Sequence, residues 1–453
     1  MAHIIAAVAT GWVRSGIGIL RTSGDGCIEA AAKVFSANSG VSLTEAKTHR
    51  MILGTLHDVQ GRVIDQCIAV VSRAPHSYTG EDTCEIQCHG SPAVLAAGLQ
   101  ALFAAGAKQA GRGEFTKRAF LNGRMDLTQA EAVIDLIDAE TADAAANAAG
   151  QVGGAMLRRI DPLYTALSDI CAHFHAVLDY PDEEIEPFAL ENFRAVLQSV
   201  RAELTGLLAS CDGGRRIKNG IRAVILGSPN AGKSSLLNAL CGYDRVIVTE
   251  VAGTTRDTVE ESVTVGRHLL RLFDTAGIRE TEDRIERMGV ERAEQAAEAA
   301  ELALFVCDAA KPLTDEDRRA MGAAKHAAHA IALRNKIDLP AVIPEDALPF
   351  DTVLSVSAKD GTGLSALEAA LDRLFPDELS CDGSILTNVR QSDAVRKARD
   401  SIDEVLRSMD AGMTPDAVLV DVEAAMQALG EVTGRTVRED ITNRIFERFC
   451  VGK

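Results

Sequence analysis

The segment Gly227-Ser-Pro-Asn-Ala-Gly-Lys-Ser234 has the composition and spacing of a phosphate-binding loop. In the pattern GxxxxGKS the glycines let backbone N–H groups approach phosphate oxygens, and Lys233 reaches the outer phosphates. Ser234 supplies a hydroxyl ligand for Mg²⁺, and the helix expected after it directs its positive N-terminal dipole at the anion. The sequence therefore predicts a nucleotide phosphate site at this loop.

Further polar motifs follow in the chain order of a guanine-nucleotide site. They are Thr254-Thr255 in a glycine-flanked loop, Asp274-Thr275-Ala276-Gly277, Asn335-Lys336-Ile337-Asp338 and Ser357-Ala358-Lys359. Together they resemble the Ras-like GTPases, in which the aspartate of NKxD pairs with the guanine edge. By that resemblance Asp338 selects GTP over ATP, because adenine lacks the two donors that a carboxylate would accept from. The alternative is that Asp338 only caps a turn.

The residue after this DTAG motif is Ile278, where many GTPases have a glutamine that orients the attacking water. A hydrophobic side chain cannot orient water, and the sequence shows no identifiable arginine finger. Catalysis must therefore recruit another polar group and another positive charge. Glu286 is the candidate base, and the alternative for it is a solvated glutamate on a helix face.

Strands and helices alternate around these motifs. Ile221–Leu226 predicts a strand directly before the phosphate loop, and the pattern continues to about Phe375. Further strand-like runs are Leu269–Phe273, Leu302–Cys307, Ala330–Leu333 and Thr352–Val356. This alternation predicts a parallel α/β sheet. The glycine-rich and charged stretch Cys211–Gly220 predicts a linker in front of it.

The first 123 residues have a different pattern. Short β-rich runs at Ile17–Leu20, Cys67–Val71 and Cys84–Cys88 are mixed with a helical stretch at Ser91–Ala105. This mixture predicts an α+β domain.

Two regions are helical throughout. Asp126 and Gln129 predict a capping box, and helical spacing continues to about Ser210, with an interruption near 180–184. The chain becomes helical again after Pro376. The expected end signals there are an N-cap at Thr414 before Pro415, a stop at Gly430, and a second capping box of Thr436 with Glu439.

Since isolated helices need a packing partner, we expect the two helical regions to form one domain. The sequence thus predicts a multidomain chain. It would have an α+β N-terminal domain (1–123), an all-α central and C-terminal domain (124–215 and 379–453), and an inserted α/β Ras-like P-loop domain (216–378).

The composition excludes several classes of protein. With 453 residues and 47% hydrophobic content the chain is neither disordered nor fibrous, and its net charge of −18 excludes an overall basic coat for nucleic acid. Residues 1–124 carry 12 Lys/Arg and 9 Asp/Glu, a balance of +3, which leaves −21 on the rest. The absence of a long apolar run or a leader pattern predicts a cytoplasmic protein with no membrane contact.

The ten cysteines are scattered, apart from Cys84 and Cys88. With His89 this pair could be part of a metal site. The favoured alternative is packing, because Cys84, Ile86 and Cys88 alternate on one face of a strand and no second ligand cluster follows.

Several segments go beyond a generic GTPase. They are Gly113–Asn122 (GEFTKRAFLN), Tyr180–Glu184, Pro229-Asn230 in the phosphate loop, Gly253–Asp257 and the ending Cys450–Lys453. These segments closely resemble the MnmE (TrmE) family of tRNA-modification GTPases, and the resemblance covers essentially the whole chain. The GEFxxRAFLN and C-x-G-K patterns are specific to that family, whereas the GTPase motifs alone also fit ribosome-assembly GTPases.

The resemblance implies a homodimer formed through an N-terminal domain that binds a one-carbon tetrahydrofolate. It also implies a FAD- and NADH-using, MnmG/GidA-like partner in a heterotetramer. Together they would add an aminomethyl-type group, or carboxymethylaminomethyl with glycine, to the wobble uridine (position 34) of certain tRNAs.

In that family a potassium ion beside the phosphates replaces the arginine finger when the GTPase domains dimerise, and it would stabilise the charge that develops on the phosphoryl group. The matching K⁺ positions are Asn230, Thr249, Val251 and Thr254, and the Mg²⁺ positions are Ser234 and Thr255. Glu286 matches the catalytic glutamate. Arg256 and Arg279 either respond to the nucleotide or are solvated.

The resemblance assigns the remaining GTP contacts to motif residues. The full set is Asn230, Ala231, Gly232, Lys233, Ser234, Ser235, Thr249, Thr254, Thr255, Asp274, Thr275, Ala276, Gly277, Asn335, Lys336, Asp338, Ser357, Ala358 and Lys359.

For folate the matching residues are Arg21, Glu85, Arg124 and Lys453. A pterin presents a donor–donor edge that suits the Glu85 carboxylate, and its glutamate tail suits cations. Cys450 is either a nucleophile near the folate or an inert terminal thiol. The chain departs from the family at Gly11–Ser15, where a Pro- and Gly-rich stretch is usual.

Two other functions compete with a tRNA-modifying enzyme. An assembly switch that binds ribosomal RNA would need an appended basic module, and the acidic C-terminal part offers none. The other possibility is a folate-binding scaffold whose GTPase acts as a timer, and the sequence does not separate it from the enzyme.

Overall fold

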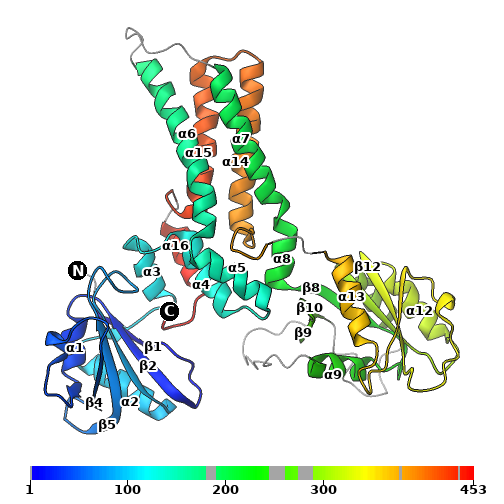
Figure 1. The fold of residues 1–453 in the computed structure, drawn as a ribbon, viewed down its shortest axis with the longest axis horizontal. Coiled ribbons are helices and arrows are strands. Elements are labelled where there is room, and N and C mark those ends of the chain that lie inside the picture. The colour runs from blue at the N-terminus through cyan, green and yellow to red at the C-terminus, as the bar shows by residue number, and fades with distance from the viewer. Residues whose placement is uncertain (1–2, 180–189, 244–260, 274–288, 377–379, 437–438) are drawn as a thin grey trace. The chain divides into compact units, whose positions relative to one another are not determined.

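The computed structural model describes residues 3–179, 190–243, 261–273, 289–376, 380–436 and 439–453. The chain forms two compact units. The first comprises 1–134, 151–197 and 397–453, and the second comprises 135–150 and 198–396. Each is described separately below, with the element labels of Figure 1.

The first unit contains a seven-stranded sheet in the order β3-β4-β5-β6-β2-β1-β7. The strands are β1 (Ile5–Val8), β2 (Ser15–Ser23), β3 (Phe35–Ala37), β4 (Met51–His57), β5 (Val63–Ser72), β6 (Thr83–Gly90) and β7 (Lys108–Gln109). All neighbours are antiparallel except β1 and β7. The three predicted β-rich runs lie within β2, β5 and β6, which confirms them.

Two helices cover one face of this sheet. Ile28 of α1 (Cys27–Ala32) and Leu95 and Leu102 of α2 (Pro92–Ala104) are fully buried in one core with Leu20 and Ile86 of the sheet. Burying these side chains provides the main driving force for the α+β arrangement.

The thiols of Cys84 and Cys88 are buried in the same core, as the packing interpretation predicts. The exposed His89 ring instead bonds to Asp65 over 2.8 Å. Among the described residues no cluster of His, Cys, Asp and Glu could hold a metal ion.

Long helices complete the first unit. Its elements are α3 (Glu114–Leu121), most of α4 (Leu127–Ile137), α6 (Ala155–Asp179), the start of α7 (Leu190–Ala209), the second half of α14 (Val389–Asp410), α15 (Pro415–Thr433) and α16 (Glu439–Phe446). Helix α6 packs along α15, and α16 contacts α3. The predicted capping box of α4 is present, since the Gln129 N–H donates to Asp126 Oδ1 over 3.0 Å and the Asp126 N–H donates to Gln129 Oε1 over 3.0 Å.

The predicted helix stop at Gly430 is wrong. Helix α15 continues to Thr433, and Gly434 has the left-handed conformation (φ 89°) that ends it. A Cβ on Gly430 would lie 2.8 Å from Thr436 Cγ2, so this glycine permits close packing inside the helix. Thr436 donates to the carbonyl oxygen of Gln427 over 3.0 Å, and the Glu439 side chain lies outside the described part.

The second unit contains a six-stranded sheet in the order β13-β12-β11-β8-β10-β9. The strands are β8 (Ile221–Leu226), β9 (Glu261–Val265), β10 (His268–Leu272), β11 (Leu302–Asp308), β12 (His329–Asn335) and β13 (Thr352–Ser355). Every pair is parallel except β9–β10. The predicted strands and the parallel α/β sheet are therefore confirmed.

Helices cover both faces of this sheet (Figure 1). The described helices of the unit include α5 (Ala142–Val152), α8 (Cys211–Asn219), α9 (Lys233–Tyr243), α11 (Gly289–Ala299), α12 (Asp315–Ala324) and α13 (Leu364–Leu374), together with the end of α4, most of α7 and the start of α14. Residues of α9 and α13 share one apolar core with the sheet, and residues of α11 and α12 share the other. A doubly covered parallel sheet explains why its strands are continuous apolar runs.

The predicted linker at Cys211–Gly220 is wrong, because residues 211–219 form helix α8. Its glycines are buried, and a Cβ on Gly214 would lie 2.2 Å from the carbonyl oxygen of Leu386. Gly214 therefore allows α8 to pack closely against the backbone at Leu386.

Within the described ranges, none of the helices combines the length and the apolar character needed to cross a lipid bilayer.

Candidate functional site

The phosphate loop lies between the end of β8 and the start of α9. Gly227 has φ 155° and Gly232 has φ 100°. A Cβ would lie 2.2 Å from the Val306 carbonyl oxygen at Gly227, and 2.1 Å from Asn335 Nδ2 at Gly232. Both positions therefore require glycine. Between them Asn230 adopts a positive φ of 61°, a conformation that asparagine tolerates better than most residues.

Lys233 folds back over this loop. Its Nζ donates to the carbonyl oxygens of Gly227 and Ser228, both over 2.8 Å. Burial lowers the pKa of the Lys233 ammonium. Phosphate oxygens would favour its charged form, so the desolvated ammonium is suited to an anionic ligand.

Asn335, at the end of β12, joins three loops and is 1% exposed. Its Nδ2 donates to the carbonyl oxygen of Ala231 over 3.0 Å, and its Oδ1 accepts from the N–H groups of Lys336 (2.8 Å) and Ala358 (3.1 Å). The phosphate loop, the NKxD motif and the Ser357–Lys359 loop are therefore held together by one amide.

Lys336 connects the NKxD motif at the end of β12 to the neighbouring strand β11. Its Nζ lies 2.7 Å from Asp308 Oδ2 at the end of β11 and donates to the Asn230 carbonyl oxygen over 2.8 Å. The ion pair and a backbone N–H hold the pKa of Asp308 below its usual value, although burial opposes this shift. Sequence reasoning missed Asp308, because its place beside Lys336 depends on the pairing of β11 with β12.

Asp338 is partly exposed beside this cluster. Its Oδ1 accepts from the Ser357 hydroxyl over 3.3 Å, and its Oδ2 lies 3.6 Å from Nζ of the largely exposed Lys359. The Asp338 carboxylate is thus held in one orientation and is still accessible to the hydrogen-bonding edge of a ligand.

The structure brings most of the predicted nucleotide residues to one edge of the sheet. Residues 227–236, 308, 335–338 and 357–359 all lie at the carboxyl ends of parallel strands, where α/β sheets bind ligands. Ser234 and Ser235 are exposed in the first turn of α9. Outside the described residues lie Thr249, Val251, Thr254, Thr255, Arg256, Asp274, Thr275, Ala276, Gly277, Ile278, Arg279 and Glu286.

Three of the four predicted folate residues meet in the first unit. Arg21 on β2 lies opposite Glu85 on β6, and its Nε donates to Glu85 Oε1 over 2.8 Å. The guanidinium also donates to the Gly452 carbonyl oxygen over 3.3 Å and lies over the rings of Tyr78 and Phe115. The C-terminal tail thus ends beside this ion pair.

Lys453 is half-buried there. Burial lowers the pKa of its ammonium, and so does the nearby Arg21, while Glu85 acts in the opposite direction. Two cations within interaction range, one of them desolvated, would be stabilised by an anion. Arg124 has a different partner, since its Nε donates to the carbonyl oxygen of Ser77, the residue before Tyr78, over 3.1 Å.

The GEFTKRAFLN segment holds the tail in place. The N–H groups of Gly113 and Phe115 donate to the carbonyl oxygens of Cys450 (3.3 Å) and Lys453 (3.1 Å). A Cβ on Gly452 (φ 103°) would lie 2.1 Å from the Val8 carbonyl oxygen, so the C-x-G-K ending needs its glycine. The Cys450 side chain is exposed.

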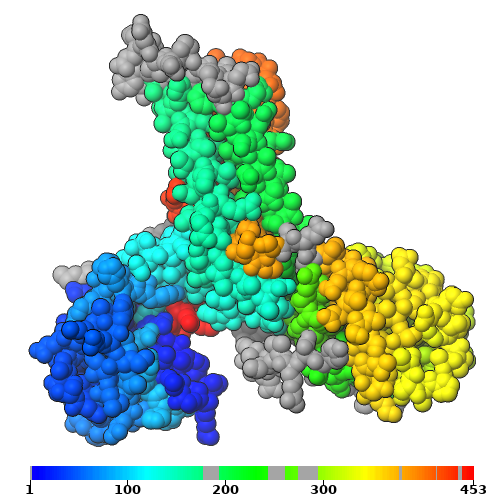
Figure 2. Space-filling model, in the orientation of Figure 1, coloured from blue at the N-terminus to red at the C-terminus, as the bar shows by residue number. Residues whose placement is uncertain are grey.

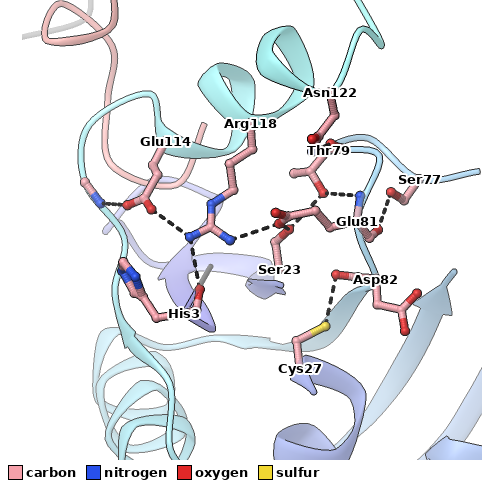
Figure 3. A network of polar contacts seen from close by, with 11 residues as sticks. His3, Ser23, Cys27, Ser77, Thr79, Glu81, Asp82, Glu114, Arg118 and Asn122 are labelled. Atoms are coloured by element: carbon pink, nitrogen blue, oxygen red, sulfur yellow. Dashed lines mark hydrogen bonds and ion pairs between the residues drawn. The ribbon is translucent and has the colours of Figure 1, made fainter. Parts of the chain in front are cut away.

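Arg118 of the same segment anchors helix α3 to the sheet. Figure 3 shows its guanidinium between Glu81 and Glu114, with 2.9 Å to an oxygen of each and 3.0 Å to the His3 carbonyl oxygen. Arg118 is only 8% exposed, so this paired network is structural and keeps the tail-binding segment in place.

Comparison with known proteins covers both units. The family model for the MnmE helical domain matches residues 127–450, and the model for the GTP-binding protein TrmE N-terminus matches residues 4–124. Curated proteins called tRNA modification GTPase MnmE include those of Symbiobacterium thermophilum (41% identical) and Lachnoclostridium phytofermentans (42% identical), each matched over 99% of both chains.

Among solved structures, the G domain of the FeoB iron transporter of T. maritima is 21% identical over 34% of this chain and 98% of that one, with a TM-score of 0.24. The two family models and the full-length relatives identify this chain as a member of the MnmE family of tRNA modification GTPases.

Proposed function

We propose that this protein binds and hydrolyses GTP in the modification of tRNA. The observation that carries the proposal is the Asn335 amide, which holds the phosphate loop and the base-recognition loops together at one sheet edge. Asp338 would accept from guanine, and Lys233 would contact the outer phosphates. The domain division 1–123, 124–215 with 379–453, and 216–378 is part of the proposal.

The finer chemistry follows the family resemblance. With a FAD-dependent, MnmG/GidA-like partner, the protein would add an aminomethyl or carboxymethylaminomethyl group to uridine 34 of certain tRNAs. The decisive experiment is nucleoside analysis of tRNA from a deletion strain, together with phosphate release from GTP and ATP by the purified chain. Unchanged wobble uridines in the deletion strain, or equal hydrolysis of GTP and ATP, would contradict the proposal.

Two metal ions belong to the proposed GTPase site. Mg²⁺ would bind Ser234 and Thr255, and K⁺ would bind Asn230, Thr249, Val251 and Thr254. Among the described members of these sets, the exposed Ser234 hydroxyl at the start of α9 is suited to a hard cation. K⁺ would supply the positive charge that an arginine finger supplies elsewhere.

A one-carbon tetrahydrofolate is the proposed ligand of Arg21, Glu85, Arg124 and Lys453. Arg21 and the half-buried Lys453 place two cations close together, which supports an anionic tail at this place, and Glu85 would pair with a pterin edge. Glu85→Ala should weaken binding about ten- to hundred-fold, because a charge-assisted hydrogen bond contributes ~1.5–3 kcal/mol.

Calorimetric titration of a formyl- or methylene-tetrahydrofolate tests this site. The comparison needs the parent, Glu85→Ala and a chain without Cys450–Lys453. If all three bind alike, or none binds, the assigned site is wrong.

We also propose a homodimer formed through the N-terminal domain. Trp12 and Val13 in the β1–β2 connection are 55% and 67% exposed, and Met51 and Leu53 on β4 are 71% and 60% exposed. The β1–β2 segment, dark blue in Figure 2, projects from its domain. Exposed apolar groups of this kind mark interaction surfaces. The segment Gly11–Ser15, where the chain departs from the family, is part of this surface.

Sedimentation of the full chain tests the dimer, and a monomer at micromolar concentration would contradict it.

A further inference from the structure

Segment 135–150 belongs to the unit that holds the GTPase sheet, although helix α4 begins in the other unit at Leu127. Two ion pairs connect this segment to the sheet region. Lys218 on α8 lies 2.7 Å from Asp135 at the end of α4, and Arg271 on β10 lies 2.7 Å from Glu140 in the connection to α5.

Arg271 has further contacts that fix its guanidinium. Its Nε donates to the Asn219 carbonyl oxygen over 3.1 Å, and its Nη1 donates to the Ser262 hydroxyl on β9. One side chain therefore joins β10 to β9, to the end of α8 and to segment 135–150. Lysine could not reproduce this arrangement, because it lacks the planar set of donors.

Strand β10 leads directly to the nucleotide motifs. It ends at Leu272, two residues before Asp274 of the DTAG motif, and it pairs in parallel with β8, which ends at the phosphate loop. Arg271 is thus one residue through which a displacement of β10 would reach segment 135–150.

The region between the segment and the sheet is not filled with packed side chains. A cavity of about 740 Å³ lies there, and its lining includes all four ion-pair residues together with Asn147 and Thr387. The far end of α5 is packed tightly, since a Cβ on Gly150 would lie 2.1 Å from the Asp382 carbonyl oxygen. The segment is therefore packed closely at one end and connected to α8 and β10 by the two ion pairs at the other.

We propose that the Arg271–Glu140 and Lys218–Asp135 ion pairs form a joint that couples the nucleotide state at the carboxyl end of β10 to segment 135–150. The four residues of these pairs position the segment and are not assigned a contact with the nucleotide. Since α4 continues from this segment toward Leu127, the joint gives the GTPase cycle a covalently continuous route toward the unit that carries the N-terminal domain. The inference rests on the proposed binding of GTP.

Hydrogen–deuterium exchange of the full chain with GDP and with a non-hydrolysable GTP analogue tests the joint. In the parent, peptides from 135–150 should exchange at different rates in the two states. In Glu140→Gln we expect that difference to fall about two- to fivefold, the range expected for a half-buried ion pair, while nucleotide affinity and turnover stay at parent values. In the same variant, tRNA modification should be lost while GTP turnover stays normal.

Two further variants exclude a general loss of stability. Glu345→Gln removes a similar pair, Glu345 with Arg334 at 2.8 Å, that does not contact segment 135–150, and it should leave the exchange difference intact. Asp135→Lys and Lys218→Glu should each reduce the difference, and the double exchange should restore it.

The outcomes separate the joint from the function on which it rests. If the parent binds GTP but shows no nucleotide-dependent exchange in 135–150, or if Glu140→Gln keeps the full difference, the joint is overturned and the GTPase assignment stands. If the parent binds no GTP, the proposed function itself fails.

Discussion

The side-chain amide nitrogen of Asn335 lies 3.0 Å from the carbonyl oxygen of Ala231, across 104 residues of sequence. This bond makes the geometry of the phosphate loop depend on the position of the NKxD motif. A nucleotide that satisfies both loops at once therefore binds to a preorganised pair of sites, which reduces the entropy cost of binding.

Asn335→Ala should weaken GTP binding by at least about tenfold. It leaves the Ala231 carbonyl oxygen and two backbone N–H groups without their amide partner, at ~1–3 kcal/mol for each group that stays buried and unsatisfied. Titration with a fluorescent GTP analogue measures the affinity, and thermal unfolding measures the accompanying loss of stability. Glu345→Gln, at an exposed carboxylate on the same sheet unit, is the control. Parent-like affinity in Asn335→Ala would remove the joining role assigned to this amide.

GTP turnover should require K⁺, because Asn230 lies in the phosphate loop and the sequence shows no arginine finger. Na⁺ is smaller and should support turnover poorly. Phosphate release in matched KCl and NaCl at equal ionic strength measures the effect. Equal rates in the two salts would contradict potassium as the source of positive charge.

Glu286→Ala should lower turnover by about 10² or more, the usual scale for a general base, with little change in nucleotide affinity. The reason is that Ile278 cannot orient water. Glu286 lies outside the described residues, so the prediction rests on sequence and resemblance. Unchanged turnover would return Glu286 to the role of a solvated helix residue.

Binding of an anionic folate should weaken as the pH rises through the pKa of Lys453. Burial and the nearby Arg21 hold that pKa below its usual 10.5 in the free protein, and a bound anion would raise it. The affinity for folate is therefore highest at a pH where the Lys453 ammonium is charged in both the free and the bound protein. It decreases as the pH rises above the pKa that Lys453 has in the free protein. Calorimetry between about pH 7 and 10 measures this loss. Lys453→Met should bind more weakly at pH 7 and show a flatter profile, and a parent-like profile would exclude Lys453 as a ligand.

The positions of the phosphate loop and the NKxD motif at the ends of strands could be predicted from the sequence because both depend on local chemistry. Glycines at 227 and 232 are needed for the backbone path, and apolar runs before each motif predict buried parallel strands. The carboxyl ends of parallel strands lie at one edge, so the order of the motifs along the chain already implied a common site.

Glycines in helical segments led to the errors. Those of α8 suggested a linker and Gly430 suggested a helix end, because glycine has low helix propensity. In the structure the Leu386 backbone approaches Gly214, and the Thr436 side chain approaches Gly430, so closely that a Cβ would not fit without a shift. The same residue type serves a flexible turn or a close packing contact, and only the neighbouring element distinguishes them.

The sequence alone thus determined the motifs that the chain carries and the strands that lead to the phosphate loop and the NKxD motif. The tertiary structure decided which distant groups meet: Asp308 with Lys336, Arg21 with the tail at Gly452, and Arg271 with Glu140. These contacts depend on strand register and on the packing of elements far apart in the sequence, which the local pattern of residues does not specify.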